Sequence, residues 1–319
     1  MKLTTEIGIN ENVICDTSYL GIIKVSGEDA SSFLQGQFSN DVNLLNETNS
    51  QLNSYNSPKG RMYASFRLFK NDENYFLLLP QEIIEPIIKR LRMFVVRSKV
   101  VLEDLSDSWK SVGLSGPAIN NEITQIPKDI EGVVHDGPTT FIRVPGLNIR
   151  ILISGPNEEI DKLTNELNKK LTPTDSNHWK RLDIHAGLPN IYSTTQESFV
   201  AQMVNLPLVN GVSFTKGCYP GQEVVARMHY LGKLKKRMYR IVIEGNSTPE
   251  PGENLYLGDN ENTQSVGEIV DAQPNNTDGI DALAVVQVNA IEKGNIRLAT
   301  QDGPTVSVAE LPYSFELDK

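Results

Sequence analysis

The amino-acid sequence predicts an α+β fold whose last part is built from strands. Over roughly the first 236 residues, segments with strand-like and helix-like hydrophobic patterns alternate. From about residue 237 the pattern changes to short apolar stretches separated by Gly, Pro, Asn and Asp, without helical periodicity. A chain of 319 residues is also longer than one hydrophobic core usually serves. We therefore expect a first region over 1–236 and a separate domain over 237–319.

Hydrophobic periodicity defines the elements of the first hundred residues. The turn residues Asn71-Asp72-Glu73-Asn74 separate two apolar runs and predict a hairpin. Pro86 is compatible with the first turn of a helix, where its missing N–H costs nothing. Strands are expected at 22–25, 63–69, 75–79 and 100–102, and helices at 28–34 and 83–95.

The middle of the chain combines short strands with two longer helices. Gly-Pro pairs interrupt residues 105–157, where Ile149–Ile153 is the clearest strand. An amphipathic helix is expected over 158–171. Another is expected over 179–186, ended by Gly187.

The C-terminal region predicts a small antiparallel barrel or a sandwich, because several short strands follow one another closely. These strands are expected at 239–243, 255–257, 266–270, 282–288 and 296–298.

The composition favours a globular protein of a reducing, cytoplasmic compartment. Hydrophobic residues make up 39% of the chain and charged residues 22%. The segment Met1–Glu6 lacks the apolar core of a secretory signal, and no apolar run approaches the thickness of a membrane. The two cysteines, Cys15 and Cys218, do not make a disulfide framework.

The net charge of −10 argues against a protein whose whole surface binds nucleic acid, because phosphate binding needs concentrated positive charge. One basic stretch departs from this balance and is either a solvated segment or an anion-binding strip. Since short charge runs are usually solvated, direct tRNA binding is not favoured. The stretch contains Lys233, Lys235, Lys236, Arg237 and Arg240.

Cys218 lies in the most distinctive segment of the chain. A nearby cation and a helix N-terminus both favour a thiolate. Lys216 would be the nearby cation, and a helix expected over 222–231 would place its N-terminus beside the cysteine. A strand is expected to end near 212–214. Glu223 would either complement the helix dipole or orient the thiol. Cys218 is therefore a candidate nucleophile, redox group or temporary ligand, although a lone cysteine is also often a small buried hydrophobe.

A resident metal cluster is not expected. A conventional cluster needs about four thiolates, or histidines in place of some. This chain has two cysteines and four histidines, and neither a CxxC nor an HExxH motif. A cluster shared with a partner protein stays open.

Five segments resemble the YgfZ-type folate-binding, tRNA-modifying proteins, which are relatives of the glycine-cleavage T-protein (GcvT). The segment with Cys218 is the signature of that family, and the others follow in the same order along nearly the whole chain. The segments are Gln35-Gly36-Gln37 with Asp41-Val42, Lys59-Gly60-Arg61-Met62 with Arg67-Leu68-Phe69, Ala186-Gly187-Leu188-Pro189, Lys216-Gly217-Cys218-Tyr219-Pro220-Gly221-Gln222-Glu223, and Leu311-Pro312-Tyr313-Ser314.

This resemblance implies a GcvT-like ring of three domains around a central site for tetrahydrofolate or a derivative. The inner α/β subdomain would cover roughly 48–104, and the C-terminal domain would be a barrel. The resemblance also implies an accessory factor in the assembly or repair of iron–sulfur enzymes. Such a factor would affect tRNA methylthiolation through an iron–sulfur client enzyme, with folate and client or assembly proteins as partners.

The resemblance further assigns residues to the folate site. Trp179 matches a folate-contacting tryptophan, while Leu20, with Tyr19 beside it, stands where the family has a second one. His185 replaces a glutamate that recognises the pterin, and an imidazole does not offer the same pair of acceptors. Asp183 on the same helix is an open alternative. The remaining assignments are Arg61, Gln222 and Arg227.

The catalytic aspartate of the T-protein aligns with Tyr63 or Ala64. The group that would activate folate N5 for aminomethyl transfer is therefore missing. We expect the accessory role rather than this transfer. Two alternatives stay open, a folate-dependent aminomethyltransferase and a non-enzymatic folate-dependent scaffold.

Overall fold

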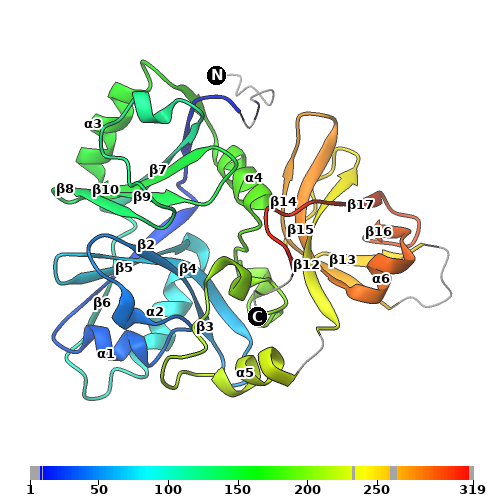
Figure 1. Ribbon diagram of the computed structural model, residues 1–319, viewed down its shortest axis with the longest axis horizontal. Coiled ribbons are helices and arrows are strands. Elements are labelled where there is room, and N and C mark those ends of the chain that lie inside the picture. Colours follow the sequence, from blue (N-terminus) through cyan, green and yellow to red (C-terminus); the bar gives the residue numbers. More distant parts are fainter. Residues whose placement is uncertain (1–7, 9, 232–233, 259–263, 316–319) are drawn as a thin grey trace.

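Three lobes surround one central helix, α4 (Ser176–Ala186), as Figure 1 shows. The computed structural model describes residues 8, 10–231, 234–258 and 264–315. The predictions on Met1–Glu6 and on Lys233 therefore fall outside the described residues. Two α/β lobes lie on one side of α4 and a β-barrel lies on the other.

The first lobe is a five-stranded antiparallel sheet in the order β3-β4-β5-β2-β6. The predicted hairpin is β4–β5, with its turn at 71–74. Two helices cover one face of the sheet. The sheet starts before the expected inner subdomain of 48–104, because β2 pairs with β5 and β6. The elements are β2 (Leu20–Ser26), α1 (Ala30–Gln35), β3 (Ser50–Asn56), β4 (Met62–Asn71), β5 (Asn74–Pro80), α2 (Ile84–Arg92) and β6 (Val101–Asp104).

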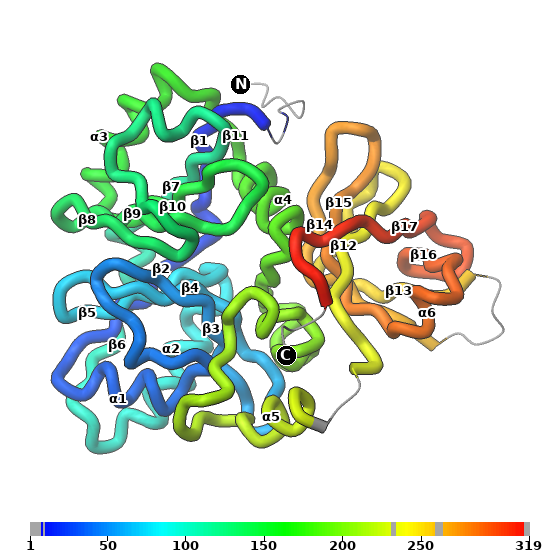
Figure 2. Tube along the Cα trace, viewed as in Figure 1, coloured from blue at the N-terminus to red at the C-terminus, as the bar shows by residue number. Residues whose placement is uncertain are grey.

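The second lobe is a six-stranded sheet in the order β11-β1-β7-β10-β9-β8. Its strand β1 comes from the N-terminal part of the chain, and Figure 2 shows this blue strand inside the green lobe. The elements are β1 (Val13–Asp16), β7 (Trp109–Gly116), β8 (Val133–Asp136), β9 (Thr139–Val144), β10 (Ile149–Pro156), α3 (Asn157–Leu167) and β11 (Thr172–Thr174).

The two sheets share a buried core because successive residues of a strand point to opposite faces. In β2, Ile23 packs under α1 and α2, whereas Ile22 joins the core shared with the second sheet. Trp179 and Leu182 of α4 enter the same core. Helix α4 thereby reaches the seam between the sheets.

The C-terminal lobe is a closed six-stranded barrel in the order β12-β15-β14-β13-β16-β17. Residues of β12 alternate between the barrel interior, as Ile241 does, and the core against α4, as Met238 does. The α+β fold class with a terminal barrel is thus confirmed. The strands are β12 (Lys236–Glu244), β13 (Asn254–Leu257), β14 (Gly267–Pro274), β15 (Gly279–Gln287), β16 (Ile296–Leu298) and β17 (Thr305–Ala309).

The connecting segments show where the sequence patterns were misleading. The C-terminal region contains α6 (Val288–Lys293), which was not expected because a six-residue helix is too short for a periodic pattern. Residues 212–214 form no strand. The expected helix over 222–231 is confirmed as α5 (Gln222–Leu231). Short 3-10 helices complete the fold: η1 (Val42–Leu44), η2 (Gln81–Ile83), η3 (Ile119–Asn121), η4 (Ser193–Thr195) and η5 (Leu206–Val209).

Candidate functional site

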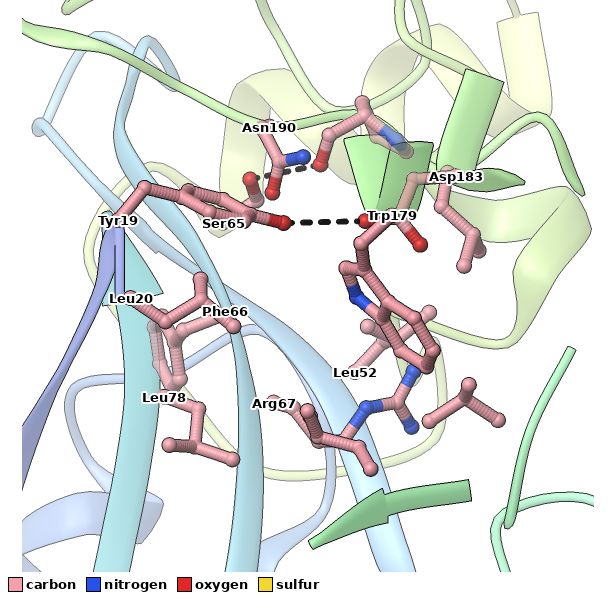
Figure 3. A pocket seen from close by; sticks show the side chains of 14 residues that line it. Tyr19, Leu20, Leu52, Ser65, Phe66, Arg67, Leu78, Trp179, Asp183 and Asn190 are labelled. Atoms are coloured by element: carbon pink, nitrogen blue, oxygen red, sulfur yellow. Dashed lines mark hydrogen bonds between the residues drawn. The ribbon is translucent and has the colours of Figure 1, made fainter. Parts of the chain in front are cut away.

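A narrow cavity opens where α4 meets the two sheets, and we call it the Trp179 cavity. Figure 3 shows Tyr19 and Leu20 across this cavity from Trp179. Predicted site residues from two distant parts of the chain therefore share one cavity, whose volume is about 60 Å³. The other lining residues are Leu52, Ser65, Phe66, Arg67, Leu78, Val144, Leu152, Asp183, Leu188, Pro189 and Asn190.

The indole of Trp179 is held firmly. Only 2% of this residue is exposed. A Cβ atom at Gly113 would lie 2.2 Å from the indole ring, so the glycine makes room for it. On the ring face, Cζ of Arg150 lies 4.1 Å from the centroid, a distance typical of a cation–π contact.

Asp183 places a carboxylate in this cavity. It follows Trp179 by four residues, so both side chains lie on one face of α4. Arg150 Nη2 donates to Asp183 Oδ1 at 2.7 Å, and the Tyr19 hydroxyl donates to Oδ2 at 3.4 Å. Burial and the Asp183 carboxylate raise the pKa of Tyr19. The phenol therefore stays a proton donor at neutral pH.

His185 lies elsewhere and joins α4 to the barrel. Its Nε2 lies 2.9 Å from Asp281 Oδ2 on β15. Arg240 Nη1 on β12 lies 3.5 Å from both Asp281 Oδ1 and His185 Nδ1. The imidazole therefore belongs to a charged interface between helix and barrel and does not line the Trp179 cavity.

Ser65 and Arg67 line the cavity from β4, and neither was among the predicted site residues. Arg67 stands in the sequence analysis only inside one of the resembling segments, yet it is buried and pairs with Glu131. The Ser65 hydroxyl donates to Pro189 O at 2.9 Å. Alternate residues of a strand point to the same face, and Ser65 lies two residues before Arg67. If Arg67 had been assigned to the cavity, the same strand pattern would have predicted Ser65 there too.

Three further predicted residues lie outside this cavity. Arg61 Nη1 donates to the carbonyl oxygen of Ser198. Gln222 Nε2 donates to Lys216 O at 3.4 Å. Arg227 is exposed on α5. None of the three forms a wall of the Trp179 cavity.

Cys218 is exposed on a turn over 216–221, which we call the Cys218 turn. Lys216 is buried, and its Nζ donates to the carbonyl oxygens of Gln35, Phe38 and Asn40 at 2.8, 2.7 and 2.7 Å. Burial lowers the pKa of Lys216 to about 8. Lys216, the cation predicted to assist the thiol, thus binds the end of α1 and the loop after it. The three carbonyl oxygens replace the water that its ammonium group loses on burial.

The Cys218 turn packs tightly against the turn between β3 and β4. Gly221 has a φ of +79°, and a Cβ atom there would lie 2.5 Å from Ser57 O. Gly60 has a φ of +73°, and its Cβ would meet Val224 at 2.9 Å. The hairpin that carries Ser65 and Arg67 into the cavity therefore also supports the cysteine.

The side chain of Glu223 is exposed in the first turn of α5. A carboxylate at this position complements the helix dipole. Among the described residues, no hydrogen bond joins Glu223 to Cys218. The geometry therefore matches the structural alternative for Glu223.

The positions of the T-protein's aspartate hold no carboxylate. Tyr63 and Ala64 are buried in the core under α2, at 7% and 0% exposure. Arg90 Cζ lies 3.7 Å from the Tyr63 ring centroid. These residues serve packing in this chain.

Two kinds of feature are absent from the described part of the chain. No three His, Cys, Asp or Glu side chains gather there in a way that would hold a metal ion. None of its helices combines the length and apolar character needed to cross a bilayer.

The fold is that of the aminomethyltransferase T proteins. The crystal structure of glycine cleavage system aminomethyltransferase T from Bartonella henselae superposes with a TM-score of 0.73 at 14% identity, over 95% of this chain and 86% of that one. A family model described as the GCVT N-terminal domain matches residues 9–136.

Among proteins with the aminomethyltransferase T fold, sequence similarity assigns this chain to one family. The tRNA-modifying protein YgfZ of Colwellia psychrerythraea is 32% identical over 310 residues, covering 96% of this chain and 94% of the relative. YgfZ of Escherichia coli (strain SE11) is 30% identical over 296 residues, covering 92% and 90%. The chain belongs to the YgfZ family of tRNA-modifying proteins.

Proposed function

We propose that this protein is a folate-binding accessory factor that supports tRNA modification. Tetrahydrofolate or a derivative binds the Trp179 cavity, and Cys218 is the functional thiol. The protein acts in the cytoplasm on an iron–sulfur client enzyme, or with its assembly proteins, and the client methylthiolates tRNA. The observation that carries the proposal is the meeting of Tyr19, Leu20, Trp179 and Asp183 around one cavity.

The chemistry of this cavity suits a pterin. Flat heteroaromatic rings pack on apolar and aromatic walls, which Trp179 and Leu20 supply. The amino edge of a pterin carries neighbouring N–H donors, and a carboxylate such as Asp183 accepts from two donors at once. In this chain Asp183 takes the role for which the resemblance indicated His185.

Binding requires the cavity to widen. Its volume of about 60 Å³ is well below the roughly 300–1,000 Å³ of typical ligand pockets. Gly113 and Arg150 clamp Trp179, so the half-buried side chains of Tyr19 and Leu20 on the opposite wall are the ones that move. Movement of Tyr19 breaks its 3.4 Å hydrogen bond to Asp183, which frees an acceptor oxygen. It also breaks the contact of the Tyr19 ring with Lys180, whose Nζ lies 4.6 Å from the ring centroid.

Cys218 is exposed and therefore accessible to a protein partner. It serves as a nucleophile, redox group or temporary ligand there. Tyr63 and Ala64 provide no base for folate N5, so aminomethyl transfer is disfavoured. The turn that carries Cys218 and the cavity share the β3–β4 hairpin, which allows folate binding to stabilise the position of the thiol.

The test compares Asp183→Asn with His185→Gln. Titration of purified protein with tetrahydrofolate should show affinity at least tenfold weaker for Asp183→Asn, because a charge-assisted contact of about 1.5–3 kcal/mol is lost. His185→Gln should bind within twofold of the unaltered protein. Equal loss in both variants, or in neither, would contradict the cavity assignment.

Cys218→Ala tests the thiol in cells that lack the native protein. Folate affinity should not change, whereas methylthiolated tRNA measured by mass spectrometry should fall. Full methylthiolation would refute a chemical role for Cys218. If Cys218→Ser keeps function while Trp179→Ala loses both folate and client binding, the scaffold alternative holds. Detectable aminomethyl transfer from a lipoyl carrier would support the transferase alternative.

A further inference from the structure

A second and larger cleft lies between α5, η5 and the start of β12, and we call it the Arg237 cleft. Its volume is about 510 Å³, within the roughly 300–1,000 Å³ range of small-molecule pockets. It shares no lining residue with the Trp179 cavity. A ligand here would therefore occupy a site independent of the proposed folate site.

The walls of this cleft are largely apolar and aromatic. Leu208 of η5 and Met228 of α5 line it on one side, with Tyr239 and Phe315 on the barrel side. The Tyr239 and Phe315 rings lie edge to face, with centroids 5.4 Å apart and an interplanar angle of 82°. Such walls bury a flat ring efficiently.

The floor of the cleft is held by hydrogen bonds from two buried amides. Asn205 Nδ2 donates to Met238 O at 2.9 Å, and Gln202 Nε2 donates to Val225 O. The first bond joins the residue before η5 to the barrel strand β12, and the second joins the same segment of the chain to α5. The cleft is therefore preformed, which lowers the entropic cost of binding.

Arg237 is the charged group of the cleft, and it has no acidic partner among the residues that the structure describes. Its Cζ lies 4.4 Å from the Phe315 centroid, and Nη1 makes a long 3.5 Å hydrogen bond to Phe315 O. Burial lowers the pKa of Arg237, an effect that Tyr239 partly offsets.

Arg237 is half-buried, and two buried arginines elsewhere in the protein show how a guanidinium is usually paired. Arg67 pairs with Glu131 and Arg150 pairs with Asp183. A guanidinium withdrawn from water is costly unless an anion accompanies it. Arg237 differs from both in facing a cleft instead of a carboxylate.

We propose that the Arg237 cleft binds a small molecule that combines a flat aromatic body with an acidic group. The aromatic body lies against Tyr239, Phe315 and the side chains of Leu208 and Met228. The carboxylate or phosphate of the ligand pairs with the Arg237 guanidinium.

The probe for this site is 8-anilinonaphthalene-1-sulfonate, which carries aromatic rings and one anionic group and fluoresces on burial. Fluorescence titration of the full chain should give one saturable site. Arg237→Met should weaken the affinity at least tenfold, because a charge-assisted contact is removed. Lys235→Met, which removes an exposed cation two residues away, should stay within twofold. Equal affinity in Arg237→Met and the unaltered protein would overturn the proposal.

A second variant keeps the test independent of the stability of Arg237→Met. Leu208→Trp should fill the cleft and abolish binding of the probe, and unchanged binding would reject this location. Saturating tetrahydrofolate should leave the affinity for the probe unchanged. Displacement of the probe by tetrahydrofolate would show that both bind at the same site and would overturn the proposal.

Competition identifies the acidic group. Displacement of the probe by 4-hydroxybenzoate supports an aromatic carboxylate, and displacement by adenosine 5′-monophosphate supports a nucleotide. Failure of both at millimolar concentration rejects the ligand class.

Discussion

Buried charged side chains in this protein derive their roles from the groups that replace water around them. Arg150 pairs with Asp183 and covers the Trp179 ring. Lys216 binds three carbonyl oxygens instead of a carboxylate. The first arrangement builds a cavity wall, and the second joins two segments of the chain.

Replacement of Lys216 by methionine should loosen the Cys218 turn. The three carbonyls would lose their donor, which costs about 1–3 kcal/mol of unfolding free energy. Urea unfolding should show this loss, and Ellman's reagent should react faster with Cys218. Lys59→Met, at an exposed position on the adjoining turn, is the control and should change neither value. An unaltered thiol rate in Lys216→Met would contradict the anchoring role.

His178 should make the protein sensitive to acid. Burial, aided by Arg181, lowers the pKa of His178 from 6.5 to about 4. Between these values the unfolded chain binds a proton that the folded chain does not, so stability falls as the pH drops from about 6.5 to 4. The full effect is about 3 kcal/mol. Urea unfolding at pH 7.5 and pH 5 should show a smaller difference for His178→Asn; an identical difference would exclude His178 as the cause.

At the scale of elements, α4 divides its side chains between two sites. Trp179 and Asp183 are four residues apart and share the face toward the cavity. His185 follows Asp183 by two residues, about 200° further around a helix, and faces the barrel. The resemblance indicated position 185, but helical geometry assigns the cavity carboxylate to position 183.

The Cys218 turn depends on one of its glycines more than on the other. Gly221→Ala should lower stability by about 1–3 kcal/mol, because the positive φ and the contact with Ser57 O both oppose a side chain. Gly217→Ala should be tolerated, since its Cβ would meet nothing within 4 Å. Thermal unfolding of the two variants measures this difference. Equal melting temperatures would show that the turn moves freely.

In the whole molecule, α4 and the segment that follows it hold the barrel to the α/β lobes through polar contacts as well as packing. Asp281 of the barrel meets His185 and Arg240. The Tyr192 hydroxyl donates to the buried Asp271 carboxylate at 2.7 Å. The C-terminal segment returns beside α4 (Figure 2), where the Tyr313 hydroxyl donates to Gly187 O at 2.9 Å.

The interface between α4 and the barrel should behave as a coupled network. Asp281→Asn and His185→Gln should each lower stability, and the double variant should lose less than the sum of the two. A coupling of about 0.5–3 kcal/mol is expected for groups in direct contact. Urea unfolding of the four proteins in this cycle gives the coupling energy. Strict additivity would show that the 2.9 Å contact contributes nothing specific.

Local signals in the sequence predicted most of the elements and the fold class. The β4–β5 hairpin, α5 and the change to a barrel near Lys236 all follow from periodicity and turn residues. The resemblance pointed to Trp179, Tyr19 and Leu20, which lie together around one cavity. Periodicity and turn residues are readable because they depend on only a few neighbouring residues. The site residues were readable because the resembling segments follow one another along nearly the whole chain.

The pairing of charged groups could be read only from the folded structure. Lys216 and Gln35 are 181 residues apart, and Arg67 and Glu131 are 64 apart. The partner of each buried charge depends on how the sheets and lobes pack. Burial removes water from the charged group, which then binds the polar group that the fold places beside it. For the same reason, Arg237, which has no carboxylate partner in the described part of the chain, was visible in the sequence only as one member of a basic stretch.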